Sequence, residues 1–276
     1  MTNNKPIGVF DSGLGGLTVV KQLMDIMPNE DIVYFGDTGR VPYGTRSRET
    51  IQKYADQDIR FLRTMDVKMI IAACGTASAV ISDEYRKKLD LPYTGVVLPA
   101  AQAAASVSAT GNIGVIGTTA TVRSGAYGKA IRTIRHDARV IGSDCPLFVP
   151  LVENGWFEED NQVARLVAEQ YLAPFMDGQV DTLILGCTHY PLLRAVIEKV
   201  LGSKVRLIDP GAETARFTAA KLMQDGMTAD SGKTGRARFF VSDTTEGFSQ
   251  NAGRFLHADV SADVERIDIE RIAESV

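Results

Sequence analysis

Two of the three cysteines occupy matching places in the sequence. Cys74 ends the apolar run at 69–74 and is followed by Gly-Thr, whereas Cys187 ends the run at 182–187 and is followed by Thr-His. A thiol near hydrogen-bond donors or a helix N-terminus has a lowered pKa and can exchange protons near neutral pH. The two segments therefore predict a pair of acid–base groups. Cys145 lacks such neighbours and is expected to be structural.

Three further side chains could assist these thiols. His189 lies two residues after Cys187, close enough in sequence to tune that thiol, and histidine changes its charge near physiological pH. Asp11 and Glu153 lie in or near loops, where a carboxylate is by default a solvated side chain. The two carboxylates gain a functional meaning only from the motifs around them.

The cysteine runs belong to a series of short β-branched runs that alternate with segments of helical periodicity. About nine runs predict strands, at 7–10, 32–35, 69–72, 94–97, 112–116, 138–141, 182–185, 205–208 and 238–241. Between the second and third runs, apolar residues recur every three or four positions from Ile51 to Leu62, which predicts a crossover helix. The fold class is therefore α/β, with mostly parallel sheets and functional loops at the carboxyl ends of the strands.

This arrangement of loops occurs twice along the chain. Segments 9–13 and 115–119 each lead from a strand into a loop that carries hydroxyl groups, and a cysteine segment follows each at a similar distance. A repeat of roughly half the chain predicts two similar α/β domains that face each other. The cleft between them is where we expect the site.

Several other functions find no support in the sequence. A formal net charge of -4 disfavours non-specific nucleic-acid binding, and the longest apolar stretch, at 95–107, is too short for a membrane span. Three widely spaced cysteines without a signal-peptide pattern indicate a reduced, cytoplasmic protein. There is no metal-ligand spacing and no lysine in a recognisable pyridoxal phosphate context.

Gly13, Gly15 and Gly16 follow the first strand, as glycines do in a dinucleotide-binding loop. The position that should hold the last glycine of that fingerprint is Thr18, so no dinucleotide site is predicted. The glycines instead predict a tight turn from strand to helix that requires positive φ angles.

Four motifs together carry a family resemblance: FDSGLGG at 10–16, YFGDT at 34–38, RVPYG at 40–44 and GCTHYPL at 186–192. With PLFVPLVE at 146–153 in the second half, the chain resembles glutamate racemases of the aspartate/glutamate racemase superfamily. The match runs from about residue 6 to residue 215 and is only loose beyond it.

The resemblance implies a fold and a reaction. Two pseudo-symmetric α/β domains would close over glutamate and racemise it without a metal or another cofactor, supplying D-glutamate for peptidoglycan. Residues 1–98 with 209–276 would form the first domain, and 99–208 would form an inserted second domain. A homodimer is also implied.

The resemblance further implies roles for individual residues. Cys74 and Cys187 would transfer the protons, assisted by Asp11, Glu153 and His189. The residues implied to hold the substrate are Asp11, Ser12, Pro42, Tyr43, Gly44, Gly75, Thr76, Thr118, Thr119, Thr121, Thr188 and His189.

One position departs from the family pattern, and two alternative functions stay open. Gly75 stands where the family commonly has asparagine, which affects the expected recognition of the substrate's polar groups but not the thiols. Aspartate racemase is one alternative, because discrimination by one methylene is worth only about 1–3 kcal/mol. A non-catalytic amino-acid-binding regulator on this fold is the other. Retention of Cys74 and Cys187 favours an enzyme.

Overall fold

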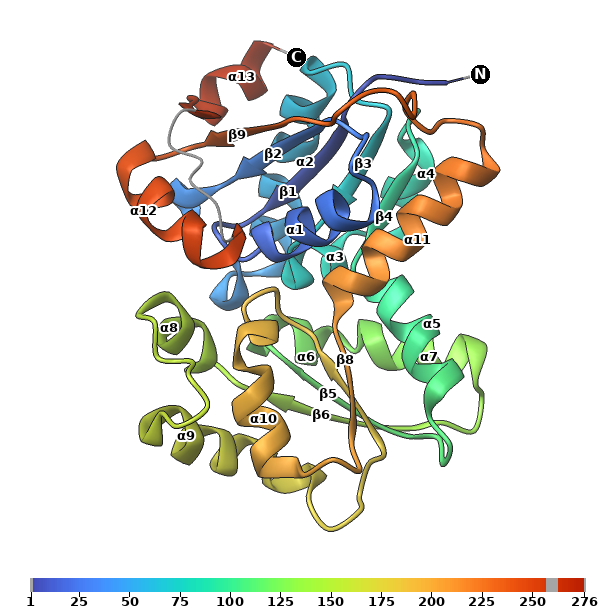
Figure 1. The fold of residues 1–276 in the computed structure, drawn as a ribbon, viewed down its shortest axis with the longest axis vertical. Helices are drawn as coiled ribbons and strands as arrows, with labels where there is room; N and C mark the ends of the chain where they lie inside the picture. Colours follow the sequence, from blue (N-terminus) through green and yellow to red (C-terminus); the bar gives the residue numbers. More distant parts are fainter. Residues whose placement is uncertain (1, 257–262, 276) are drawn as a thin grey trace.

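The computed structural model describes residues 2–256 and 263–275, and these form two parallel β-sheets surrounded by helices (Figure 1). The strands are β1 (Ile7–Asp11), β2 (Ile32–Gly36), β3 (Met69–Ala72), β4 (Tyr93–Gly95), β5 (Asn112–Gly117), β6 (Arg139–Asp144), β7 (Thr182–Leu185), β8 (Arg206–Ile208), β9 (Ala237–Val241) and β10 (Val264–Arg266). Every pairing between them is parallel. The predicted fold class is confirmed.

Helices connect the strands, as parallel pairing requires. The α-helices are α1 (Leu17–Ile26), α2 (Arg48–Thr64), α3 (Gly75–Val80), α4 (Asp83–Lys88), α5 (Val97–Val107), α6 (Thr119–Ser124), α7 (Ala126–Ile134), α8 (Phe148–Glu153), α9 (Gln162–Leu172), α10 (Arg194–Leu201), α11 (Pro210–Gln224), α12 (Thr245–Leu256) and α13 (Ile269–Ser275). Short 3-10 helices are η1 (Thr38–Arg40), η2 (Tyr43–Thr45), η3 (Ala173–Phe175) and η4 (Tyr190–Leu193). None of the described helices is long and apolar enough to cross a lipid bilayer.

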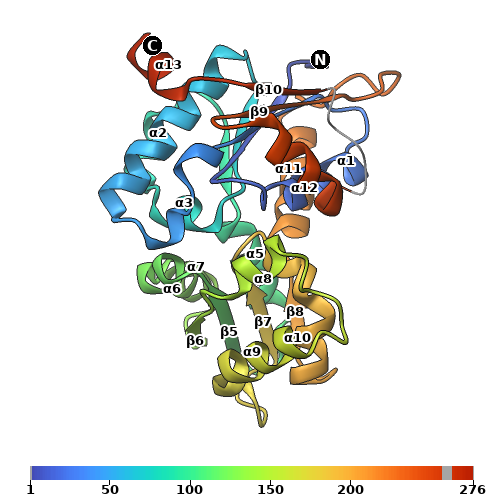
Figure 2. The same cartoon turned by 90° about the vertical axis from the view of Figure 1, so that its left-hand side faces the viewer.

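The two sheets share one strand order. The six-stranded sheet runs β10-β9-β2-β1-β3-β4 and the four-stranded sheet runs β6-β5-β7-β8. If β5 is matched with β1, then β6, β7 and β8 match β2, β3 and β4, so the smaller sheet repeats four strands of the larger one. Figures 1 and 2 show the sheets one above the other, with β9, β10 and their helices added to the upper one. The predicted repeat is thus present in the topology.

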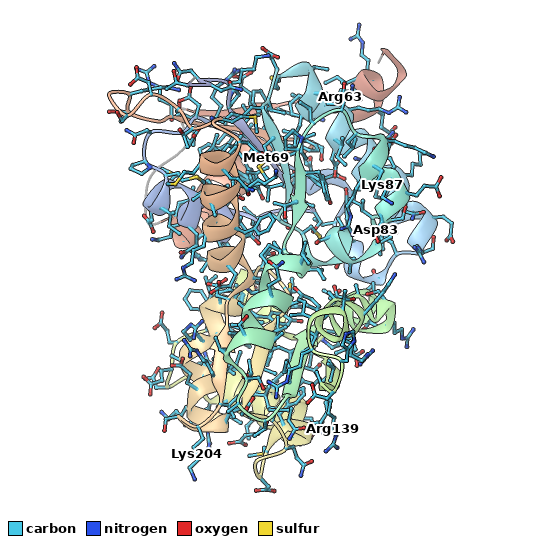
Figure 3. All side chains as sticks on the ribbon, turned by 90° about the vertical axis from the view of Figure 1, so that its right-hand side faces the viewer. Arg63, Met69, Asp83, Lys87, Arg139 and Lys204 are labelled. Carbon is cyan, nitrogen blue, oxygen red and sulfur yellow. The ribbon has the colours of Figure 1, made fainter. Side chains whose placement is uncertain are left out.

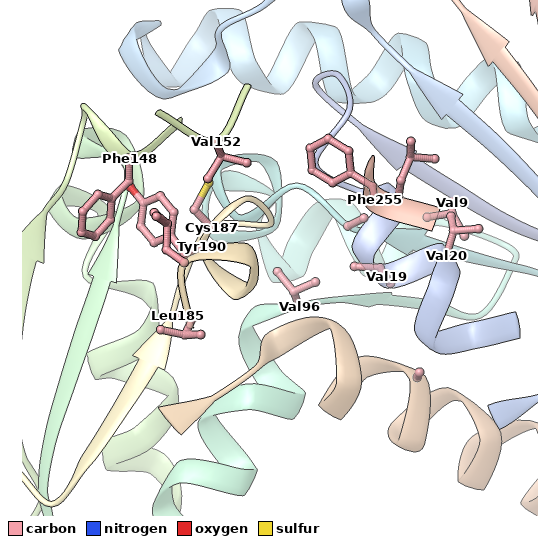
Figure 4. Packing of buried hydrophobic residues seen from close by; sticks show 14 of the residues in the cluster. Val9, Val19, Val20, Val96, Phe148, Val152, Leu185, Cys187, Tyr190 and Phe255 are labelled. Carbon is pink, nitrogen blue, oxygen red and sulfur yellow. The ribbon is translucent and has the colours of Figure 1, made fainter. Parts of the chain in front are cut away.

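Alternate residues of each strand enter different hydrophobic clusters. On β1, Val9 packs toward α1, α11 and α12, whereas Phe10 packs toward α2 and α13. One cluster continues from the upper sheet into the lower one, where it includes Leu185. Figure 4 shows this continuity, with Cys187 beside Tyr190 and Val152 on one side and Val9 and Phe255 on the other. The two halves therefore share part of their core.

Charged side chains cover the outside of both halves. Figure 3 shows Met69 within the upper half, whereas Arg63 and Lys87 extend from its surface and Arg139 and Lys204 lie at the far end of the lower half. Because burying an unpaired charge is costly, this distribution leaves the interior to apolar groups and to a few polar ones. The buried polar groups include Asp11, Thr76, Thr121, Thr188 and His189, which lie where the two halves meet.

Some boundaries differ from the sequence prediction. The run at 94–97 was expected to be a strand, but β4 ends at Gly95 and α5 begins at Val97, because an apolar run alone does not distinguish a buried strand from the first turn of a buried helix. Strand β10 was not predicted. Its three residues, Val264–Arg266, include two charged residues and give no β-branched run.

Candidate active site

The carboxyl ends of the central strands of both sheets point toward each other. Asp11 ends β1 and Cys74 follows the neighbouring β3, while Thr118 follows β5 and Cys187 follows the neighbouring β7. Contact between the two sets of loops is direct, since the Thr76 and Thr118 hydroxyl groups lie 2.9 Å apart. The topology thus brings together residues that are far apart in the sequence.

Glycines allow this close approach. A Cβ added to Gly75 would overlap the carbonyl oxygen of Gly186, and one added to Gly15 would lie 2.6 Å from Nδ1 of His189. Gly16 has a similar role within its own half, where an added Cβ would lie 2.5 Å from Cβ of Asp11. Both Gly75 and Gly15 face backbone or side chains of the opposite half, so larger residues would push the halves apart.

The prediction of positive φ angles in the glycine-rich turn is wrong. Gly13, Gly15 and Gly16 are absent from the described residues with positive φ, and Gly16 has φ -60°. The turn needs glycine for space rather than for a left-handed backbone. The Tyr34 hydroxyl beneath it donates to the carbonyl oxygen of Gly13 at 2.7 Å.

Cys74 is the buried N-cap residue of α3. Its side chain is 4% exposed, its sulfur accepts a hydrogen bond from the backbone N–H of Ala77 at 3.4 Å, and it lies 3.6 Å from the hydroxyl of Ser12. The expected lowering of its pKa is wrong in direction. Burial, followed by the nearby Asp11 carboxyl, raises the pKa of Cys74 to about 12, because desolvation of a thiolate outweighs the single backbone donor.

Cys187 has a different set of neighbours. It is 8% exposed, and its sulfur lies 3.8 Å from Nδ1 of His189, whose Nε2 lies 3.1 Å from a carboxylate oxygen of Glu153. Burial opposes a charge on the imidazole, but the hydrogen bonds to Cys187 and Glu153 outweigh it and raise the pKa of His189 to about 10. The cysteine, histidine and glutamate therefore form a chain that leads from the interior to the surface, where the Glu153 side chain is 46% exposed.

Helix α12 of the upper half covers this chain. The Phe255 ring meets the His189 ring edge-on at a centroid distance of 5.8 Å, and the Arg254 guanidinium donates to the carbonyl oxygen of Glu153 at 3.1 Å. Elements from both halves thus build the surroundings of Cys187.

Asp11 is buried between the two cysteine loops. One carboxylate oxygen accepts from the backbone N–H of Gly13 at 2.9 Å, while the other has no hydrogen-bond partner among the described residues. Burial raises the pKa of Asp11, and the charge of His189 partly opposes this effect. A buried oxygen without a partner is ready to accept a hydrogen bond from a bound molecule.

Three threonine hydroxyl groups form a cluster that joins the halves. Thr118 lies 2.9 Å from Thr76 and 3.0 Å from Thr121, and Thr76 lies 3.4 Å from Thr121. Thr119 is directed elsewhere, since its hydroxyl donates to Asp144 at 2.8 Å. Thr188 is joined to the upper half through its carbonyl oxygen, which accepts from Thr18 at 3.2 Å.

The loop that contains Pro42, Tyr43 and Gly44 reaches the same hydroxyl cluster. A Cβ added to Gly44 would lie 2.8 Å from Cβ of Thr118. Pro42 is exposed, whereas the Tyr43 side chain is buried. Its hydroxyl bonds to Asp37 and Asp58.

Sequence reasoning missed Asp37 and Asp58 as members of this region. Asp58 lies seven residues after Ile51, on the apolar face predicted for 51–62, and both carboxylates are fully buried. A charged residue in register with an apolar helix face was the signal that could have revealed it.

A cavity of about 1050 Å³ lies beside these loops. Gly44 and Thr119 line it, as do the basic side chains of Arg86, Arg123 and Lys129. It borders the loops described above without including either cysteine of the pair.

Cys145 lies apart from these groups. It is fully buried, its thiol donates to the carbonyl oxygen of Ser143 at 3.6 Å, and burial raises its pKa. These contacts are those of a packing residue. Within residues 2–256 and 263–275, no three histidine, cysteine, aspartate or glutamate side chains are grouped as metal ligands would be.

Comparisons with known proteins agree on one family. Residues 17–218 match the family Asp/Glu/Hydantoin racemase. The glutamate racemase of Geobacter metallireducens is 46% identical over 96% of this chain and 97% of its own. The crystal structure of a glutamate racemase isoform from Bacillus anthracis is similar with a TM-score of 0.91 and 38% identity, covering 96% of this chain and 98% of its own. A glutamate racemase from Francisella tularensis, solved in complex with D-glutamate, gives a TM-score of 0.89 and 39% identity over 97% and 99% of the two chains.

Proposed function

Since this chain belongs to the glutamate racemases of the Asp/Glu/Hydantoin racemase family, we propose that it interconverts L- and D-glutamate by two-base proton transfer between Cys74 and Cys187. The observation that carries the mechanism is the meeting of two cysteine loops at the facing carboxyl ends of β3 and β7. Neither half holds both thiols, so a substrate bound between the halves would have one sulfur on each side.

The chemistry needs this placement. Racemisation removes the α-proton from one face of the carbon and delivers a proton to the other, so one group must act as base while the opposite group acts as acid. A thiol and a thiolate suit the task because thiolate is a compact, polarizable base. In the reverse direction the two sulfurs exchange roles.

His189 would assist Cys187. An imidazolium 3.8 Å from the sulfur can balance negative charge on it, and Glu153 orients the ring through the opposite nitrogen. The unpartnered oxygen of Asp11 would accept from the substrate ammonium group between the two thiols.

The substrate carboxylates would meet hydroxyl and backbone donors. These donors lie near the contact between the halves. Ser12 and Thr188 are on loops, whereas the hydroxyl cluster of Thr76, Thr118 and Thr121 lies at the N-terminal turns of α3 and α6. Donors fixed in a region without bulk water stabilise the negative charge that develops when the α-proton leaves. Pro42, Tyr43 and Gly44 would form the outer wall of this region.

We further propose the division into domains at 1–98 with 209–276 and at 99–208. The two sheets support it, although the boundary at 98 falls within α5 and the boundary at 208 falls at the end of β8. A cytoplasmic homodimer that supplies D-glutamate for peptidoglycan remains our expectation from the family.

Exchange with heavy water tests the mechanism. With L-glutamate as substrate, the first D-glutamate formed should carry solvent deuterium at the α-carbon, while recovered L-glutamate should stay largely protiated. Mass spectrometry of both enantiomers at low conversion measures this. Protium retained in the early product would mean that one base serves both faces and would contradict the proposal. L-aspartate in a parallel assay should turn over far more slowly if glutamate is the substrate.

A further inference from the structure

Four polar side chains form a buried cluster beside the proposed substrate loop. Asp37 and Asp58 are fully buried, Tyr43 is 1% exposed and the Arg40 side chain is 10% exposed. The cluster joins η1, η2 and α2 to strand β2, which ends one residue before Asp37. The mechanism above assigns Tyr43 only to the outer wall of the substrate region and gives Asp37, Asp58 and Arg40 no role.

Both carboxylate oxygens of Asp37 accept hydrogen bonds. Its Oδ2 accepts from Nε of Arg40 at 2.7 Å and from the Tyr43 hydroxyl, and its Oδ1 accepts from the Ser242 hydroxyl at 2.8 Å. Three donors to one carboxylate are the arrangement of an ionised group. The charge of Arg40 balances it.

Asp58 lacks a donor for one of its oxygens. Its Oδ1 accepts from Nη2 of Arg40 at 3.1 Å, while its Oδ2 lies 3.0 Å from the same Tyr43 hydroxyl oxygen that bonds to Asp37. The hydroxyl has only one proton and gives it to the closer partner, Asp37. Two acceptor oxygens would then face each other across 3.0 Å unless Oδ2 of Asp58 carries a proton itself.

We propose that Asp58 is protonated in the folded enzyme and donates to Tyr43, which donates to Asp37, so that Asp58 is a positioning residue for the substrate loop. The cluster of Asp58, Tyr43, Asp37 and Arg40 is then electrically neutral, and each hydrogen bond in it has one donor and one acceptor. A neutral cluster is also the form that burial permits, because a second buried charge without a partner would be costly.

The charges around Asp58 agree with this protonation. Burial, followed by the neighbouring Asp37, raises the pKa of Asp58; Arg40 and the hydrogen bond with Tyr43 oppose the shift but do not outweigh it, and Asp11 adds to it. Gln57 accepts from Arg40, and the Tyr54 ring lies 4.2 Å from the guanidinium carbon, so neither adds a charge.

The effect on the site passes through Tyr43. Its ring and hydroxyl fix η2, and the next residue, Gly44, approaches Thr118 of the opposite half closely. Loss of the anchor would let this loop move away from the hydroxyl cluster, which should weaken substrate binding more than proton transfer. This consequence rests on the proposed function, whereas the protonation itself can be tested without turnover.

The first experiment compares Asp58→Asn with Asp58→Ala. Asparagine supplies an N–H₂ donor to Tyr43 and an oxygen acceptor to Arg40, so it reproduces the proposed neutral form, whereas alanine removes both. We expect Asp58→Ala to raise KM for glutamate about tenfold with kcat within about threefold, and Asp58→Asn to restore KM to within about twofold of the original. If Asp58→Asn fails to fold or has the KM of Asp58→Ala, an ionised Asp58 is required and the proposal is wrong.

The second experiment measures thermal unfolding against pH. A free aspartate ionises near pH 3.9, so the unfolded chain loses this proton as pH rises while the folded chain keeps it. The original enzyme should therefore lose stability relative to Asp58→Asn as pH rises from 5 to 8, with the Tm difference growing by up to about 3 °C per pH unit. A Tm difference that does not change with pH would overturn the proposal, even if the proposed racemase mechanism is correct.

Discussion

The two cysteine loops are equivalent in topology but differ in their surroundings. Cys74 caps the N-terminus of α3, belongs to the hydrophobic cluster around α2 and has the Asp11 carboxyl nearby. Cys187 begins no α-helix, belongs to the cluster that spans both halves and has the cationic His189 beside it. One thiol therefore has a carboxyl as its nearest charged group, and the other has an imidazolium.

The comparison shows that the repeated strand order determines where the two sulfurs lie, whereas the residues around each sulfur determine its chemical environment. Matching strands place both sulfurs, whereas His189, Glu153 and the covering helix α12 are specific neighbours of Cys187. Such an asymmetry biases which of the two sulfurs carries the proton before substrate binds, whereas two thiols in identical surroundings would share it equally.

Removing either sulfur should have the largest effect. A serine hydroxyl is a far poorer base near neutral pH, so Cys74→Ser and Cys187→Ser should each lower kcat for both enantiomers by at least about 10³-fold. Cys145→Ser is the matched control and should retain activity. Circular dichroism with each enantiomer as substrate measures the rates, and normal racemisation by Cys187→Ser would end the paired-thiol mechanism.

Removing the imidazole should have the next largest effect. His189→Asn takes away the charge beside Cys187 and should lower kcat by about 10²-fold, the lower range for a positioned proton-transfer partner. Glu153→Gln should lower kcat by about tenfold or less, because water screens the half-exposed carboxylate. Since the two enantiomers have equal free energies, kcat/KM should fall by the same factor in both directions. Equal losses in the two variants would show that histidine does not act through its own charge.

These two predictions depend on features that the sequence revealed to different degrees. Strand periodicity and the doubled loop pattern predicted the parallel sheets and the placement of Cys74 and Cys187 at facing sheet edges. The direction of the Cys74 pKa shift was not predictable, because it depends on how much water the packed loops exclude. Asp58 was missed because one polar residue in an apolar helix pattern does not show which side chains face it.

A substitution at Gly75 tests how closely the two loops must approach. Gly75 stands where the family commonly has asparagine, and its contact with Gly186 predicts the direction in which a side chain there would change KM. Any Cβ at residue 75 collides with backbone, so Gly75→Ala and Gly75→Asn should both raise KM for glutamate by about tenfold. If asparagine lowers KM while alanine raises it, a new hydrogen bond to the substrate outweighs the collision. An unchanged KM in both variants would mean that the two loops can move apart without weakening substrate binding.

The smallest effect should come from the end of β7 opposite to Cys187. Asp181 precedes this strand and accepts from the Ser108 hydroxyl at 2.6 Å and from the Thr110 backbone N–H at 2.6 Å. Burial opposes its charge, but these hydrogen bonds outweigh it and lower the pKa of Asp181 to about 2.

Asp181→Asn should therefore destabilise the fold without changing activity. The stabilisation is present above the unfolded pKa of about 3.9 and is lost as pH falls toward 2, and solvent screening of this partly exposed group limits it to about 1 kcal/mol at neutral pH. Urea unfolding should show that difference at pH 7 and a smaller one near pH 3. A loss of kcat in this variant would mean that a change at the amino end of β7 affects Cys187 beyond its carboxyl end. The two ends of the strand would then not have separate structural and functional roles.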